Sequence, residues 1–229
     1  MSVILVDYPL LLVNLKTYRE GMGENAASLA RIAERVYKRT GVSIAVAPQP
    51  TDLLLVTEST DTLVFSQHID PIRPGAHTGQ ILPEAVVEAG CSGTLINHSE
   101  RQMDIASIQG AIKRAKEVDL VSIVCVDTVK RARRIARMSP DGIAIEPPEL
   151  IGSGIPVSKA QPEIISGTVE AVKKVNKNVK VLCGAGITNA RDVEAAIELG
   201  AEGILVASGV VKAEDPYKAL LDLAAPMRG

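Results

Sequence analysis

The chain has 229 residues and a formal net charge of −2 at pH 7, a balance that gives no general attraction to nucleic acid or to an anionic membrane. Hydrophobic residues make up 46% of it, and they are mainly aliphatic because there is one Phe and no Trp, which suits buried parallel strands. Three cysteines, Cys91, Cys125 and Cys183, lack the spacing of a zinc site or a disulfide framework, so we expect no metal and a reducing, cytoplasmic location.

The elements alternate from one end of the chain to the other. The first apolar stretch, residues 3–13, is interrupted by Asp7 and Pro9 and has no basic start, so it fits neither a signal peptide nor a membrane span. Short apolar runs predict strands at residues 10–14, 43–47, 63–67, 93–97, 121–126, 142–145, 180–183 and 203–207. Amphipathic patterns predict helices near residues 25–39, 51–58, 83–89, 104–117, 129–137, 162–176, 190–199 and 216–224.

This alternation predicts the fold class. Eight β/α units without a break in composition indicate one domain, residues 1–229, built on a parallel sheet. A closed barrel and an open doubly wound sheet both accept such a pattern. The number eight favours the closed eight-stranded parallel (β/α)8 barrel, the TIM-barrel architecture, although the chain is shorter than its typical ~250 residues. We therefore expect trimmed helices or loops.

A carboxylate ends the sixth predicted strand. Glu146 follows an apolar run, and Pro147 and Pro148 come directly after it, so the strand must stop there because proline cannot donate to a sheet ladder. A carboxylate held at a strand end is well placed to act as a base. The next stretch, which finishes in glycines at 152 and 154, is typical of a lid that closes over a ligand. The ordinary alternative is a solvated Glu.

Two other strands are followed by polar residues. Asn14 and Lys16 come at the end of the first strand, on the same side by strand alternation, and His98 follows the fourth strand with Glu100 two positions later. A barrel of this type builds its site from the loops at these strand ends. The alternatives are a lysine that reaches the rim and a structural histidine. His68 and His77, without such neighbours, are interpreted as structural or interface residues.

Glycine-rich turns follow the sixth, seventh and eighth strands. Gly184, Ala185 and Gly186 form the second of these turns, and Ala207 and Ser208 begin the third. Backbone N–H groups in such turns approach an anion closely, and a phosphate site after strands seven and eight recurs in this barrel. A phosphate site, a carboxylate base, a histidine and a lysine at one rim suit proton abstraction next to a carbonyl, with the resulting enediolate stabilised by the donor and the cation.

These residues together resemble the triosephosphate isomerase family over the whole chain. Asn14-Leu15-Lys16 is similar to its Asn-x-Lys, residues 98–101 to its His-Ser-Glu-Arg, and Glu146-Pro147 with residues 151–154 to its catalytic Glu and lid. The resemblance implies that Glu146 moves the proton, that His98 polarises the carbonyl, and that Lys16 holds the anionic substrate. It implies support from Asn14 and Glu100, and no cofactor. It implies a phosphate site lined, largely through backbone, by Ile151, Gly152, Gly184, Ala185, Gly186, Ala207 and Ser208.

The chain departs from the bacterial and eukaryotic members of that family. It has no Trp after Asn14 or in the lid, and their Tyr-Gly-Gly-Ser turn is Cys183-Gly184-Ala185-Gly186 here. The short length and the Pro-Pro-Glu-Leu-Ile-Gly lid resemble the archaeal branch, whose members are often tetramers. The resemblance therefore implies a homo-oligomer, a tetramer in preference to a dimer. It places the contact in Gly75, Ala76, His77, Thr78 and Gly79, similar to the loop that docks into a neighbouring subunit.

Two other functions are weighed against this one. The first is another phosphate-binding barrel, a sugar-phosphate isomerase or a synthase of amino-acid biosynthesis, for which Cys125 and Asp127 are the nearest candidates for a Cys/Asp pair. Lys16, His98 and Glu146 are not expected together there. The second is an inactive barrel that only binds a phosphorylated metabolite or a partner protein, and such a barrel has no need for a base, a donor and a cation.

Overall fold

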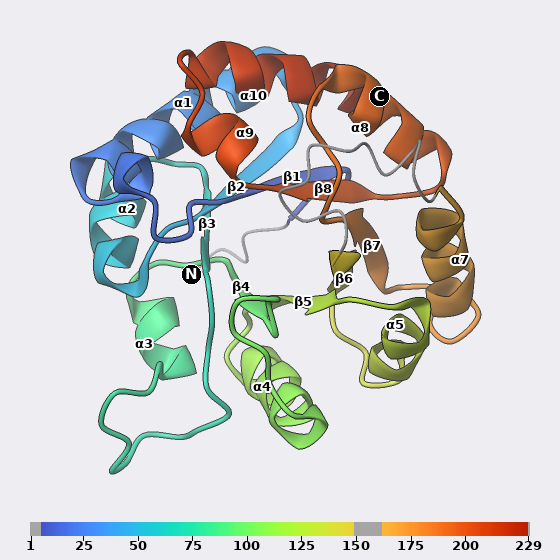
Figure 1. Cartoon of the computed structure of the whole chain (residues 1–229). Helices are drawn as coiled ribbons and strands as arrows, with labels where there is room; N and C mark the ends of the chain where they lie inside the picture. Colours follow the sequence, from blue (N-terminus) through green and yellow to red (C-terminus); the bar gives the residue numbers. More distant parts are fainter. Residues whose placement is uncertain (1–5, 149–161, 229) are drawn as a thin grey trace.

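Eight parallel strands close into a barrel in the computed structural model of the chain, which describes residues 6–148 and 162–228 (Figure 1). The strands are β1 Leu10–Asn14, β2 Ser43–Ala47, β3 Leu63–Ser66, β4 Gly93–Ile96, β5 Val121–Val126, β6 Gly142–Ile145, β7 Lys180–Cys183 and β8 Gly203–Val206. Leu10 of β1 pairs with Ser43 of β2 on one side and with Gly203 of β8 on the other. The closed barrel is therefore confirmed, and the open sheet is wrong because an open sheet has no pairing between its first and last strands.

Helices lie around the outside of this barrel (Figure 1). They are α1 Glu24–Thr40, α2 Leu53–Ser59, α3 Pro83–Glu88, α4 Ile105–Glu117, α5 Val129–Ala136, α7 Pro162–Lys173, α8 Ala190–Glu198, α9 Ser208–Val211 and α10 Pro216–Ala224. Short 3-10 segments cover Arg19–Gly21, Pro50–Asp52 and Ala225–Met227. The predicted elements agree with these to within a few residues at their ends, and α9 is an addition to them.

Side chains at the helix starts explain several boundaries. Asp104 and Thr128 accept backbone N–H groups of the first turns of α4 and α5, and Asp215 does so for α10. Asn189 begins α8 with a capping box, in which its side chain and that of Asp192 bond each other's backbone. These contacts satisfy N–H groups that have no partner within a helix, so they fix where each helix begins.

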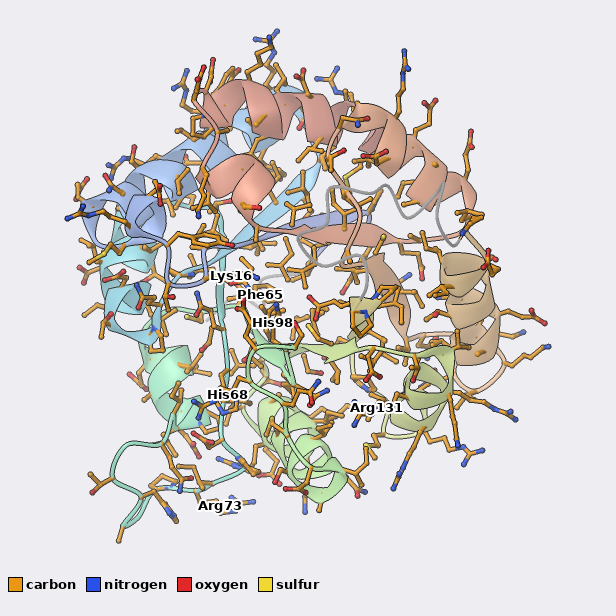
Figure 2. All side chains as sticks on the ribbon, viewed as in Figure 1. Lys16, Phe65, His68, Arg73, His98 and Arg131 are labelled. Carbon is orange, nitrogen blue, oxygen red and sulfur yellow. The ribbon has the colours of Figure 1, made fainter. Side chains whose placement is uncertain are left out.

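Alternate residues of each strand pack into two different cores. The inner core fills the barrel and consists of Leu10, Leu12, Ala45, Ala47, Phe65, Leu95, Ile123, Cys125, Ala144, Leu182 and Leu205. The outer core lies between the strands and the helices and includes Leu11, Val13, Ile44, Val46 and Ile143. Phe65 reaches the middle of the barrel (Figure 2), and a Cβ at Gly93 would lie 2.6 Å from its ring. The interior is thus a packed core, which leaves the strand ends to form a site.

The connection after β3 extends away from the barrel (Figure 1). Its neck is closed by Asp70, whose backbone N–H donates to the Ile81 carbonyl at 2.9 Å and whose carboxylate accepts the Ile81 N–H at 2.7 Å. Buried Arg114 of α4 donates to the Ile72 carbonyl at 2.8 Å and forms ion pairs with Glu84 and Glu117. We call the exposed part of this connection, residues 73–80, the arm.

No helix within residues 6–148 and 162–228 combines the length and the apolar character that crossing a membrane requires.

Candidate active site

A cavity of about 300 Å³ opens at the carboxyl ends of the strands. Its lining residues come from the ends of β1 and β8, from the loops after β1, β4, β6, β7 and β8, and from the start of α9. They are Asn14, Lys16, Tyr18, His98, Glu146, Gly184, Ala185, Gly186, Ile187, Thr188, Leu205, Val206, Ala207, Ser208 and Gly209. Figure 2 shows Lys16 and His98 near the centre of the barrel, whereas His68, Arg73 and Arg131 lie farther out.

Lys16 reaches the cavity from a strained backbone position. Its φ of 48° lies in the left-handed region, which is unfavourable for a long side chain. Two hydrogen bonds hold it there: its N–H donates to Asn14 Oδ1 at 2.9 Å, and its carbonyl accepts Gln67 Nε2 at 2.9 Å. Its ammonium forms an ion pair with Glu100 Oε1 at 2.8 Å. Simple strand alternation therefore does not explain the position of Lys16, although Asn14 and Lys16 both line the cavity.

His98 is buried, and a backbone hydrogen bond orients its ring. The backbone N–H of Glu100 donates to His98 Nδ1 at 3.2 Å, so that nitrogen carries a lone pair and the ring hydrogen is on Nε2. Asn97 precedes it at a φ of 60°, a conformation that Asn tolerates, and its side-chain amide donates to the Cys125 carbonyl at 2.8 Å. The Nε2 of the ring therefore faces Glu146, on the cavity side.

Glu146 faces that hydrogen. Its Oε1 lies 3.3 Å from His98 Nε2, and the residue is 5% exposed. Its backbone N–H donates to the Val126 carbonyl at 2.8 Å, which extends the pairing of β5 and β6 to the point where the prolines end it. A Cβ at Gly184 would lie 2.7 Å from Glu146 Cγ, so the glycine leaves the room that the Glu146 side chain occupies.

Cys125 lies on the inner side of the same carboxylate. Burial raises the pKa of its thiol well above the usual value, and the negative charge of Glu146 raises it further. The thiol therefore stays protonated beside Glu146. Asp127 instead forms an ion pair with Arg131 at 2.8 Å on the exposed start of α5.

The rest of the cavity lining comes mainly from the turns after β7 and β8. Cys183 Sγ donates to the Ala185 carbonyl at 3.3 Å, and Gly186 has a φ of 70°, so the turn after β7 bends sharply beside the cavity. Ala207 precedes α9 and, as its N-cap, accepts the backbone N–H groups of Val210 and Val211. Backbone N–H groups in turns of this kind can contact an anion.

The turn after β7 ends in a hydrogen-bonded cluster at the start of α8. Thr188 lines the cavity, and its N–H and hydroxyl donate to Asp192 Oδ2 at 2.8 and 2.5 Å. The N–H and side-chain amide of Asn189 donate to the same oxygen at 3.2 and 3.1 Å. Asp192 is 4% exposed, and these donors surround its charge.

The structure brings together most of the residues singled out in the sequence. Asn14, Lys16, His98 and Glu146 line one side of the cavity, and the residues of the two glycine-rich turns line the other. Ile151 and Gly152 lie outside the described residues. The arm, which contains residues 75–79, is exposed and contributes nothing to the cavity lining. Among the described residues, no three His, Cys, Asp or Glu side chains form a group suited to a metal ion.

Tyr18 and Gln67 are residues at or next to the cavity that the sequence did not single out. Tyr18 lines the cavity, and Lys212 Nζ lies 4.2 Å from the centre of its ring. Its position two residues after Lys16 was the only signal in the sequence. The sequence predicts Gln67 as the end of a strand. Its contact with the Lys16 carbonyl depends on the distance between two loops, which no local pattern encodes.

Known proteins are similar to this chain over most of its length. Residues 9–225 match the family model described as triosephosphate isomerase. The chain is 53% identical over 214 residues to triosephosphate isomerase of Methanocaldococcus jannaschii. The aligned residues are 93% of this chain and 98% of the relative. It is 53% identical over 222 residues to that of Methanothermus fervidus, with 97% and 100% covered. For Methanothermobacter thermautotrophicus the values are 52% over 219 residues, with 96% of each chain covered. The family match spans every strand of the barrel.

Proposed function

Because this chain belongs to the triosephosphate isomerase family, we propose that Glu146, His98 and Lys16 carry out the proton transfers of its reaction. The enzyme interconverts D-glyceraldehyde 3-phosphate and dihydroxyacetone phosphate, an intramolecular aldose–ketose isomerisation. The reaction is a step of glycolysis and, in the reverse direction, of gluconeogenesis. Its chemistry requires a base, a donor for the carbonyl oxygen and a site for the phosphate.

Glu146 is the base in this proposal. Its carboxylate takes a proton from the carbon next to the carbonyl, the C–H electron pair becomes a second carbon–carbon bond, and the carbonyl pair moves to oxygen. The product is an enediolate. Glu146 then returns the proton to the neighbouring carbon, and the carbonyl forms again at the other position. Its burial favours this role because a base that is shielded from water returns its proton to the substrate.

His98 stabilises the oxygen that becomes negative. Its ring offers Nε2–H as a donor, and the same nitrogen can pass its hydrogen from one oxygen of the enediolate to the other. The observation that carries the proposal is the pairing of this Nε2 with Glu146 Oε1 at 3.3 Å, because it puts a buried acid–base pair at the mouth of one cavity.

Lys16 and the two turns bind the charged substrate. The ammonium of Lys16 lines the cavity on the side of the proton transfer and lowers the energy of the enediolate by its charge. The phosphate is bound by the backbone N–H groups of Ala185, Gly186, Ser208 and Gly209, with Gly184, Ala207, Ile151 and Gly152 as further residues of the site. Asn14 and Glu100 orient Lys16 through the hydrogen bonds described above.

The test is an assay that couples dihydroxyacetone phosphate formation to its reduction by NADH, with D-glyceraldehyde 3-phosphate as substrate. We expect the protein to form this product and Glu146→Gln to lose about 10³-fold in kcat, because the amide cannot accept the proton. Glu146→Gln should still bind a phosphorylated enediolate analogue. Glu58→Gln on the exposed surface of α2 is the matched control. Failure to form the product contradicts the function, and a near-normal rate of Glu146→Gln removes Glu146 as the base.

We also propose that the chain forms a homo-oligomer through the arm, a tetramer in preference to a dimer. The exposed residues 75–79 extend from a neck that the Asp70–Ile81 bonds and Arg114 hold in place, which suits a rigid contact between copies. Light scattering should give the mass of four chains, and Thr78→Arg should lower that mass. A monomeric wild-type protein would contradict this proposal without affecting the assignment of Glu146.

A further inference from the structure

Asp192 makes more contacts than the start of a helix requires. A capping box needs one bond from the N3 side chain to the N-cap backbone, and the bond from the Asn189 N–H at 3.2 Å provides it. Three more donors reach the same oxygen, and two of them belong to Thr188, which lies outside α8. Asp104, which caps α4, provides a comparison: its acceptor bonds go to groups within that helix.

The residues that Asp192 holds are the end of the cavity wall. Thr188 follows the turn of residues 184–187 directly, and all five residues line the cavity. The turn is also fastened at its start, where the Gly184 N–H donates to the Ile145 carbonyl at 2.9 Å and Cys183 Sγ bonds Ala185. The turn contains two glycines, Gly184 and Gly186, which lose much conformational freedom when the turn is ordered.

We propose that Asp192 is a positioning residue for the substrate phosphate, which acts through Thr188 on the turn after β7. This inference rests on the proposed function of that turn. Fixing both ends of a glycine-rich segment in advance removes an entropy cost that phosphate binding would otherwise include. The side chain of Asp192 does not line the cavity. Its effect is therefore on substrate affinity, and the proton transfer stays unchanged.

The experiment compares Asp192→Asn with the wild type by KM, kcat and the inhibition constant of inorganic phosphate. We expect KM and the inhibition constant to rise about tenfold, equivalent to 1.4 kcal/mol, with kcat within about twofold. Asp104→Asn is the matched control: it removes the same charge from a helix start, and both constants should stay unchanged. Thr188→Val, which keeps the backbone N–H but loses the hydroxyl, should raise both constants by a smaller factor.

Three outcomes overturn the proposal. Unchanged KM and phosphate inhibition in a folded Asp192→Asn mean that the residue only stabilises α8. A loss confined to kcat means that it acts on proton transfer. If Asp192→Asn does not fold, unchanged constants in Thr188→Val overturn the link between Asp192 and the turn. Failure of the proposed function is distinguishable, because it removes product formation and phosphate inhibition from the wild type itself.

Discussion

The two sides of the cavity are built differently. On one side, Lys16, His98 and Glu146 present side chains from three separate loops, and hydrogen bonds and ion pairs with their neighbours orient them. On the other side, residues 184–186 and 207–209 present mainly backbone, and small residues leave it accessible. On the first side, a substitution can therefore change the chemistry of a side chain without changing the shape of the cavity. On the second side, a substitution affects substrate binding mainly by changing the shape of the backbone or by adding a charge.

Gly184 joins the two sides. It begins the backbone side, and the space where its side chain would be is occupied by Glu146 Cγ, 2.7 Å from an ideal Cβ. The size of a residue after β7 thus determines where the carboxylate after β6 can lie. The comparison predicts that substitutions on the first side change mainly kcat and that substitutions on the second change mainly KM.

His98→Gln should have the larger effect. The amide can occupy the position of the ring, but it has no nitrogen that can both donate to the carbonyl and pass on a proton, so kcat should fall about 10²- to 10⁴-fold. The inhibition constant of inorganic phosphate should stay within about twofold, because the backbone side is intact. Steady-state kinetics with phosphate as inhibitor test this. A large change in phosphate inhibition would show that the two sides are not separable.

Gly209→Asp should have the smaller effect, on the other side. A Cβ there would meet no atom within 4 Å, so the fold should accept the substitution, and the added carboxylate would repel the substrate phosphate. We expect KM to rise about tenfold and the difference to shrink at high salt, because salt screens exposed charges. Gly209→Asn has the same shape without the charge and is the control. Equal KM values for the two variants would contradict a phosphate site at α9.

Much of the fold could be predicted from the sequence because its signals are local. Each strand is a short aliphatic run, each long helix has an apolar stripe, and a barrel follows from eight repeats of the pair. The side-chain half of the site was also predictable. Asn14 ends a strand, Lys16, His98 and Glu146 each follow one, and the carboxyl ends of parallel strands meet at one end of a barrel.

The remainder depends on packing between distant segments. α9 has four residues, too few to produce a helical period, and it begins with Ser208-Gly209, which is typical of a turn. The bond between Gln67 and Lys16 joins residues 51 positions apart, and the contact between Gly184 and Glu146 joins two loops. The role of Asp192 requires knowing that the Thr188 hydroxyl points back to α8, which its spacing alone does not decide.

The three cysteines have a consequence for how unfolding can be followed. All three are buried, and burial raises the pKa of Cys91 and of Cys183 to about 12 and that of Cys125 well above its usual value. The thiolate is the reactive form of cysteine, so the native chain presents almost none at neutral pH. An alkylating reagent will therefore modify these residues only after the barrel opens. The rate at which Cys91, Cys125 and Cys183 become labelled therefore reports how often the native fold opens.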